Sequence, residues 1–154
     1  MKSILAIDPG ASGGFALASN EITECFPTPH TTGDICDLVR SLKSEHDLAV
    51  CYIEDIPKFV GKAIPSSSAA VLFENYGFTQ GVLMAMGVPT IRVRPQEWQK
   101  HFSLGTARAC GSTTVWKNKL KAEAQRRFPN CKVTLKTADA LLILDYARAR
   151  EGVK

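Results

Sequence analysis

Three acidic residues stand where their carboxylates could share one chemical task. Asp8 ends the apolar run of "ILAID", Glu54 closes another in "CYIED", and Asp139 follows Thr137 by two residues in "KTADALLI". Carboxylate oxygens are the ligands that Mg²⁺ and Mn²⁺ prefer, and two such ions about 3.5–4 Å apart can activate water for phosphodiester cleavage. Taken singly, these acids also suit a turn, a solvent-exposed strand end and the first turn of a helix. The fold must bring them together before that chemistry becomes the better explanation.

The apolar pattern predicts the elements that would carry these acids. Strands are expected over residues 3–7, 14–18, 21–26, 47–55 and 88–95, and helices over 33–43, 68–86, 96–102, 115–128 and 137–150. Short glycine-containing turns make the first three strands antiparallel, whereas the continuous apolar run of the fourth is typical of a central parallel strand. If this strand lies about 4.8 Å from the first, Asp8 and Glu54 can hold one divalent ion. Thr137 is the expected N-cap of the last helix, whose first turn then carries Asp139 across the sheet.

These elements combine into one α/β domain spanning residues 1–154. Three antiparallel strands followed by parallel strands predict a mixed five-stranded sheet with helices on both faces, the arrangement of a ribonuclease H-like fold. The stretch 103–114, which consists of small and polar residues, is expected to form a loop.

The composition indicates the class of protein and the cellular compartment to expect. Hydrophobic residues make up 45% of the chain and charged residues 22%, which is ordinary for a globular domain. The five cysteines are odd in number and show no CxxC spacing, which argues against a disulfide framework or a structural zinc site and favours a reducing compartment. We find no signal peptide or long apolar run, so we expect a cytoplasmic protein, in the host cytoplasm if it is phage-encoded, with no membrane partner.

A basic helix is expected over residues 115–128. It carries five Lys and Arg residues and a single acid, Glu123. Such a helix suits a phosphate backbone, and a solvated helix face is the simpler alternative. The residues we expect to bind DNA here are Lys117, Lys119 and Lys121.

The loop after Glu54 carries a second group of candidate DNA contacts, Lys58, Phe59 and Lys62. An aromatic ring in such a loop can stack on an unpaired base. The alternative for Phe59 is that it packs into the core beneath the loop.

Four segments that cover most of the chain resemble the RuvC-type Holliday junction resolvases, especially the plant organellar and phage-type members. In the family's order they are "ILAIDPGASGGFALA", "CYIED", "ENYGFTQGVLMAMGVPTIRVRPQEWQKHF" and "KTADALLILDYARA". The resemblance implies a metal-dependent, structure-selective endonuclease that resolves four-way DNA junctions by paired symmetric nicks, leaving 5′-phosphate and 3′-hydroxyl ends. It also implies that Asp8, Glu54 and Asp139 bind the catalytic Mg²⁺ or Mn²⁺, two ions per active site.

The same resemblance assigns further roles. Phe59 resembles the aromatic residue that family members place at the junction centre, and Lys117 lies nearest the family's basic position. Two symmetric cuts require two active sites, so a homodimer is implied. The helix over 68–86 is the candidate interface because Gly77 and Gly81 would let another helix approach, although a covered sheet face would explain them equally well.

Lys136 departs from the family pattern. RuvC-type enzymes carry an acid or a histidine one helical turn before the last acid, where this chain has Lys136. A protonated lysine cannot bind Mg²⁺, but it can contact the scissile phosphate or a leaving oxygen as a point charge, so Lys136 is a candidate catalytic residue. Either another group completes the second metal site, or the second ion is held weakly, or the chain binds junctions with impaired cleavage.

Two other functions remain as alternatives. A ribonuclease H-like nuclease could act on other branched nucleic acids with the same acids. Actin-like kinases also carry a glycine-containing loop like that of residues 8–14, but they need two lobes that close on ATP. A chain of 154 residues supplies only one lobe, so we expect no nucleotide cofactor.

Overall fold

The sheet has five strands in the order β3-β2-β1-β4-β5. The structure is a computed structural model that describes residues 2–20, 22–58 and 64–153. The strands β1 (Ser3–Asp8), β2 (Gly14–Ser19) and β3 (Ile22–Pro27) are antiparallel, while β4 (Leu48–Glu54) runs parallel to β1 and β5 (Thr90–Val93) runs parallel to β4. The predicted mixed sheet, with its first and fourth strands as neighbours, is confirmed.

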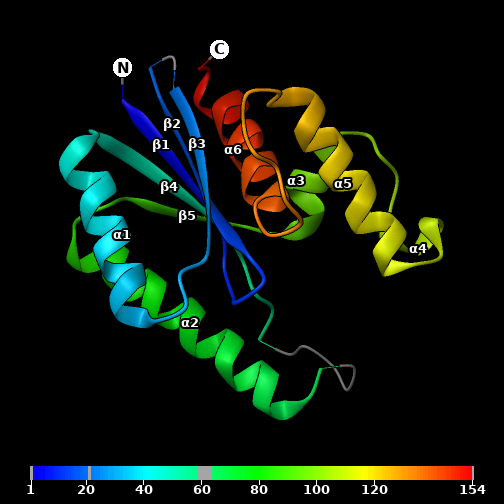
Figure 1. Ribbon diagram of the computed structural model, residues 1–154, viewed down its shortest axis with the longest axis horizontal. Coiled ribbons are helices and arrows are strands. Elements are labelled where there is room, and N and C mark those ends of the chain that lie inside the picture. The colour runs from blue at the N-terminus through cyan, green and yellow to red at the C-terminus, as the bar shows by residue number, and fades with distance from the viewer. Residues whose placement is uncertain (1, 21, 59–63, 154) are drawn as a thin grey trace.

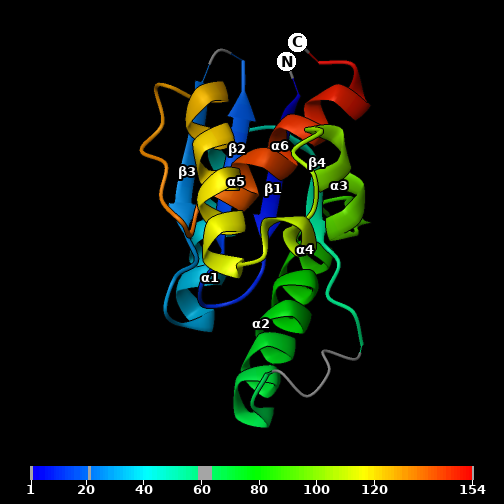
Figure 2. The same ribbon diagram turned by 90° about the vertical axis from the view of Figure 1, so that its right-hand side faces the viewer.

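Helices cover both faces of this sheet, as predicted (Figure 1). The helices α1 (Thr32–Glu45) and α2 (Ser66–Ala85) pack on one face, and α3 (Pro95–His101), α5 (Thr113–Arg127) and α6 (Ala138–Glu151) pack on the other. Figure 2 looks onto this second face. These elements begin and end within two residues of the predicted positions. No helix in the described ranges is both long and apolar enough to cross a membrane.

The central strand β1 is buried on both faces. Its side chains alternate between two cores because successive residues of a strand point to opposite sides. Ile4 and Ala6 belong to the core beneath α6, and Leu5 and Ile7 belong to the core beneath α1 and α2. Burial on both faces explains why this strand is a continuous apolar run that stops at Asp8.

The predicted loop over 103–114 is wrong in part, because it contains the single helical turn α4 (Ala107–Cys110). The side chain of Thr106 caps this turn by accepting a hydrogen bond from the backbone N–H of Ala109, at 3.2 Å. Gly111 ends it with a φ of 72°. One capped turn is too short to show a helical repeat of apolar residues, so periodicity does not predict it.

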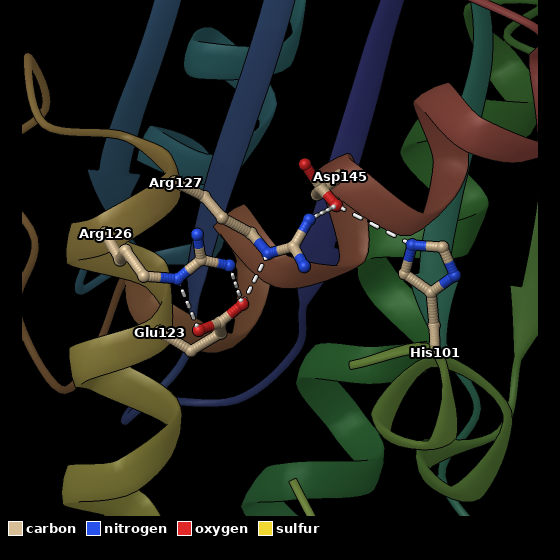
Figure 3. A network of polar contacts seen from close by, with 5 residues as sticks. All are labelled: His101, Glu123, Arg126, Arg127 and Asp145. Atoms are coloured by element: carbon tan, nitrogen blue, oxygen red, sulfur yellow. Dashed lines mark hydrogen bonds and ion pairs between the residues drawn. The ribbon is translucent and has the colours of Figure 1, made fainter. Parts of the chain in front are cut away.

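A polar network fastens α3, α5 and α6 together (Figure 3). Arg127 donates to the Asp145 carboxylate on α6 at 2.8 Å and to Glu123 on its own helix at 2.6 Å. His101 on α3 lies 3.7 Å from the same Asp145 carboxylate, and Arg126 donates to Glu123 at 2.7 Å. Arg126 and Arg127 of the 115–128 segment therefore bind protein carboxylates.

Candidate active site

Two carboxylates lie side by side where β1 and β4 end. Even-numbered residues of both strands face the α6 layer, so Asp8 and Glu54 point toward the same layer. The two strands pair in register up to Ile7 and Ile53, which makes Asp8 and Glu54 the next neighbours. The expected placement of these acids at corresponding strand ends is confirmed.

The third carboxylate reaches this place from α6. Asp139 lies in the first turn of that helix, and its side chain is 13% exposed. Lys117 of α5 points at it, with Nζ 3.6 Å from Oδ2 of Asp139. Thr137 occupies the N-cap position as predicted, but its hydroxyl accepts from the backbone N–H of Thr134 at 2.9 Å rather than from α6.

Neighbouring carboxylates contribute to the raised pKa values of Asp8 and Glu54. Burial, followed by the charges of Glu54 and Asp139, raises the pKa of Asp8 well above its ordinary value. Burial also raises the pKa of Glu54 to about 7, with a further contribution from Asp139. The pKa of Asp139 is raised by burial and lowered in part by Lys117. The cluster therefore carries more negative charge than its surroundings neutralise when all three groups ionise.

Trp98 is a partner of the site that sequence analysis missed. Its side chain is fully buried, and the indole Nε1–H donates a hydrogen bond of 2.7 Å to Oε2 of Glu54. This bond favours the ionised carboxylate and lowers the Glu54 pKa against the effect of burial. Asp55, the next acid of "CYIED", belongs elsewhere, because it accepts a hydrogen bond of 2.8 Å from the Tyr76 hydroxyl on α2.

An open hollow of about 530 Å³ gives access to this edge of the sheet. The turn of residues 8–13 forms one side of it, and the start of α2 forms another through Ser67, Ser68, Val71 and Leu72. Lys117 also lines the hollow. A phosphate group that enters here would meet the Asp8 carboxylate and the Lys117 ammonium together.

The donor set fits a hard divalent cation by its chemistry. In the described part of the chain, no three His, Cys, Asp or Glu side chains are grouped closely enough to hold a metal ion as they stand. All three groups of the cluster are nevertheless carboxylates, and their burial makes joint ionisation costly without a nearby cation. Metal binding by Asp8, Glu54 and Asp139 stays a prediction.

The predicted DNA contacts separate into different environments. Lys119 donates to the backbone carbonyl of Leu104 at 2.6 Å, so its ammonium already has a protein partner. Lys58 is exposed in the loop that follows β4. Phe59 and Lys62 lie outside the described residues.

A second hollow, of about 640 Å³, lies beside the start of α6. Lys121 and Lys136 line this hollow together with Lys132. Lys136 is exposed in the turn before α6 and lines this second hollow, whereas Asp8 and Lys117 line the first. Its catalytic role therefore stays a prediction, while Lys117 has the direct contact with an acid of the cluster.

Gly14, at the start of β2, lies where three parts of the backbone meet. A Cβ at this position would lie 2.6 Å from the Lys136 carbonyl oxygen and 2.8 Å from that of Phe26. Only a residue without a side chain allows this close approach, since real Cβ contacts are not that short. The glycine thereby positions the segment that leads into α6 and Asp139.

Comparison with solved structures confirms the predicted RuvC-type, ribonuclease H-like fold. One match is Thermus thermophilus RuvC in complex with a Holliday junction substrate, at a TM-score of 0.64 and 14% identity over 99% of this chain and 97% of that chain. Another structure of the same RuvC gives a TM-score of 0.57 and 14% identity over 98% and 97%. No protein-family model matches the chain, and no curated protein matches it by sequence.

Proposed function

We propose that this chain is a metal-dependent, structure-selective endonuclease that resolves four-way DNA junctions by paired symmetric nicks. The observation that carries the proposal is the buried pair Asp8 and Glu54 at the ends of two neighbouring strands, joined by Asp139 from the first turn of α6. The RuvC fold supports it, because the likeness extends over nearly the full length of both chains. The solved RuvC complex is described as containing a Holliday junction substrate.

The three carboxylates would bind Mg²⁺ or Mn²⁺, two ions per site. Bound ions of this kind supply an activated water and stabilise the charge that develops on the phosphate and the leaving oxygen. Trp98 keeps Oε2 of Glu54 in a fixed direction. Lys117 offsets part of the negative charge and lines the hollow through which the substrate phosphate would approach.

The DNA would be held mainly through its phosphates. Lys117 lines the first hollow, and Lys121 and Lys136 line the second, beside the α6 start, which supports a path for the DNA backbone along this edge. Phosphate contacts of this kind give affinity without sequence information and weaken with salt. Lys58, Phe59, Lys62 and Lys119 complete the proposed set of DNA-binding residues.

A homodimer would supply the two active sites that paired nicks require. Gly77 and Gly81 are exposed on α2, and no described atom outside the local helix lies within 4 Å of a Cβ built at either position. Met84, which is 80% exposed, follows on the same side of the helix at helical spacing. These residues support α2 as the dimer interface.

Cleavage of a synthetic four-way junction tests the proposal. We expect the wild type to make symmetric nicks with Mg²⁺ and none with a chelator, and Asp8→Asn to bind the junction without cutting it. Asp55→Asn is the matched control, because Asp55 is a strand-end acid that faces α2 and should leave cleavage intact. Three-way junctions, flaps and RNA–DNA hybrids in the same assay would reveal a different preferred substrate. A well-folded wild type that neither binds nor cuts branched DNA would refute the proposal.

A junction-binding protein with impaired cleavage is the second candidate, and Lys136 is the observation that favours it. The expected result for that function is junction binding without nicks in either Mg²⁺ or Mn²⁺. In that case Lys136→Asp should introduce cleavage, because it supplies the acid that RuvC-type enzymes carry there. Nicks by the wild type would exclude this candidate.

A further inference from the structure

Cys25 and Cys131 lie far apart in the sequence, but the thiol of each contacts a backbone carbonyl oxygen near the other. Cys25 on β3 directs its Sγ to the carbonyl oxygen of Lys132 at 3.8 Å, and Cys131 directs its Sγ to that of Thr23 at 3.5 Å. Lys132 directly follows Cys131, and Thr23 stands two residues before Cys25. These reciprocal contacts place the two thiols next to each other.

A second observation agrees with this geometry. The pKa of Cys131 is raised first by burial and then by the neighbouring Cys25 thiol. Figure 2 shows the segment between α5 and α6 running alongside β3. The two sulfur atoms therefore lie where edge strand β3 meets the segment that leads into α6.

Small molecules can reach this pair. Both cysteines are partly exposed residues, and all five cysteines of the described chain are free. Cys25 also lines the second hollow, whose other residues include Lys121, Lys132 and Lys136. Those lysines would attract an anionic oxidant to the sulfur.

We propose that Cys25 and Cys131 form a reversible disulfide when the protein meets a low-molecular-weight disulfide such as oxidised glutathione. The Cys25 thiol loses its proton to solvent, and its sulfur attacks the glutathione disulfide, forming a mixed disulfide and releasing one glutathione thiolate. The Cys131 thiol then loses its proton and attacks Cys25 Sγ, which releases the second glutathione. Two protein thiols are oxidised, and one glutathione disulfide is reduced.

The bond would fasten edge strand β3 to the segment that leads into α6. That segment contains Lys132 and Lys136, which are both exposed and both sites for trypsin. A covalent link beside them should slow tryptic cleavage after either lysine. It should also raise the Tm by about 5–10 °C, since it closes a loop of more than a hundred residues in the unfolded chain.

The test treats the reduced full-length protein with oxidised glutathione and counts free thiols in denaturant. We expect five thiols to fall to three, with peptide mapping that joins Cys25 to Cys131 and full reversal by a dithiol reductant. Cys25→Ser and Cys131→Ser should each abolish the crosslink, the rise in Tm and the resistance to trypsin. Cys36→Ser and Cys110→Ser are the controls, because these cysteines lie on α1 and α4 and should leave the crosslink unchanged.

Three results would overturn the proposal. They are five free thiols after treatment, a glutathione adduct on Cys25 that never resolves, and a crosslink that survives in Cys131→Ser. The crosslink needs no nuclease activity, so its measurement stands whether or not the chain cuts DNA.

Discussion

Asp8, Glu54 and Asp139 owe their altered titration mainly to burial, and mutual repulsion adds to it for Asp8 and Glu54. Two protein groups act against these effects. Lys117 places a positive charge beside Asp139, and Trp98 gives Glu54 a directed hydrogen bond. The lysine side chain is 45% exposed, whereas the tryptophan is enclosed in the core. Trp98 is therefore the residue that sets the orientation of Glu54.

Trp98→Phe should weaken metal binding while keeping an aromatic ring in the core. The variant removes the Nε1–H donor, and a hydrogen bond to a charged group contributes about 1.5–3 kcal/mol, so we expect at least a tenfold rise in the Mg²⁺ concentration for half-maximal cleavage. Calorimetric titration with Mn²⁺ in the absence of DNA should show the same loss. Trp116→Phe is the control, because Trp116 is also buried in this core but belongs to α5. Equal effects of the two variants would mean that packing alone matters.

At the scale of elements, the acid cluster depends on how β2, β3 and the segment before α6 meet. Gly14 is the contact point, with two carbonyl oxygens that would lie within 3 Å of a Cβ. Both neighbours belong to backbone, so neither can move aside without shifting its element. The position of α6, and with it Asp139, is coupled to this one residue.

Gly14→Ala should destabilise the fold by about 1–3 kcal/mol, the usual cost of forcing extra volume into a packed region. Urea unfolding measures this change. Gly33→Ala in α1 is the matched control, because a Cβ there makes only an ordinary contact of 3.7 Å with Thr31 Oγ1. If both variants were equally stable, the close approach at Gly14 would not be a constraint on the fold.

The helices and strands and their order could be predicted from the sequence, because buried elements carry apolar residues at regular spacing. The continuous apolar run of β4 indicated a central strand, and that placement predicted the meeting of Asp8 and Glu54. Contacts between distant side chains left no such pattern. The indole of Trp98 lies 44 residues from Glu54 in sequence, and Cys25 lies 107 residues from Lys132. The sequence pattern therefore predicted the meeting of the carboxylates, but it predicted neither the hydrogen bond of Trp98 to Glu54 nor the pairing of Cys25 with Cys131.

The basic residues of α5 differ in their partners in a way that their sequence does not indicate. These residues look alike in sequence, yet Arg127 holds Asp145, Lys119 holds a backbone carbonyl and Lys117 faces Asp139. Which side of α5 each residue occupies depends on how the helix packs against α6. The basic charge of this helix predicted a DNA-binding surface. In the structure, Arg127 and Lys119 use their charge for contacts within the protein.

For the whole molecule, the buried acids make stability depend on pH. The pKa of Glu54 is about 7 in the folded protein against an ordinary 4.5, so the folded state keeps a proton that the unfolded state releases. Stability then falls as pH rises through this window and levels off above it. Asp8 and Asp139 shift in the same direction.

With a chelator present, we expect the free energy of unfolding to be lower at pH 8 than at pH 5.5, by on the order of 2 kcal/mol from Glu54 alone. Mg²⁺ should recover much of the loss at pH 8, because it binds only the folded cluster. Thermal unfolding in the four conditions measures both effects, and Glu54→Gln should reduce the pH dependence. Stability that rises toward pH 8 in chelator would contradict this expectation.

The dimer is a prediction for the whole assembly. Gly77→Leu adds bulk on the exposed side of α2 without a described neighbour to displace, so the monomer should keep its fold. In sedimentation at micromolar concentration, the wild type should have about twice the chain mass of 16.8 kDa, and Gly77→Leu should have the mass of one chain. Gly33→Leu, on exposed backbone of α1, should leave the dimer intact. A wild type of 16.8 kDa would rule out this assembly.

The direction of β1 and α6 has a practical consequence. β1 runs toward the acid edge and α6 begins there and runs away, so both ends of the chain leave the fold at the opposite end of the sheet (Figure 1). Six residues of strand span about 17 Å between that end and Asp8. A fluorescent label, an affinity handle or a surface tether for single-molecule observation can therefore be attached at either end of this chain and remain clear of the acid edge.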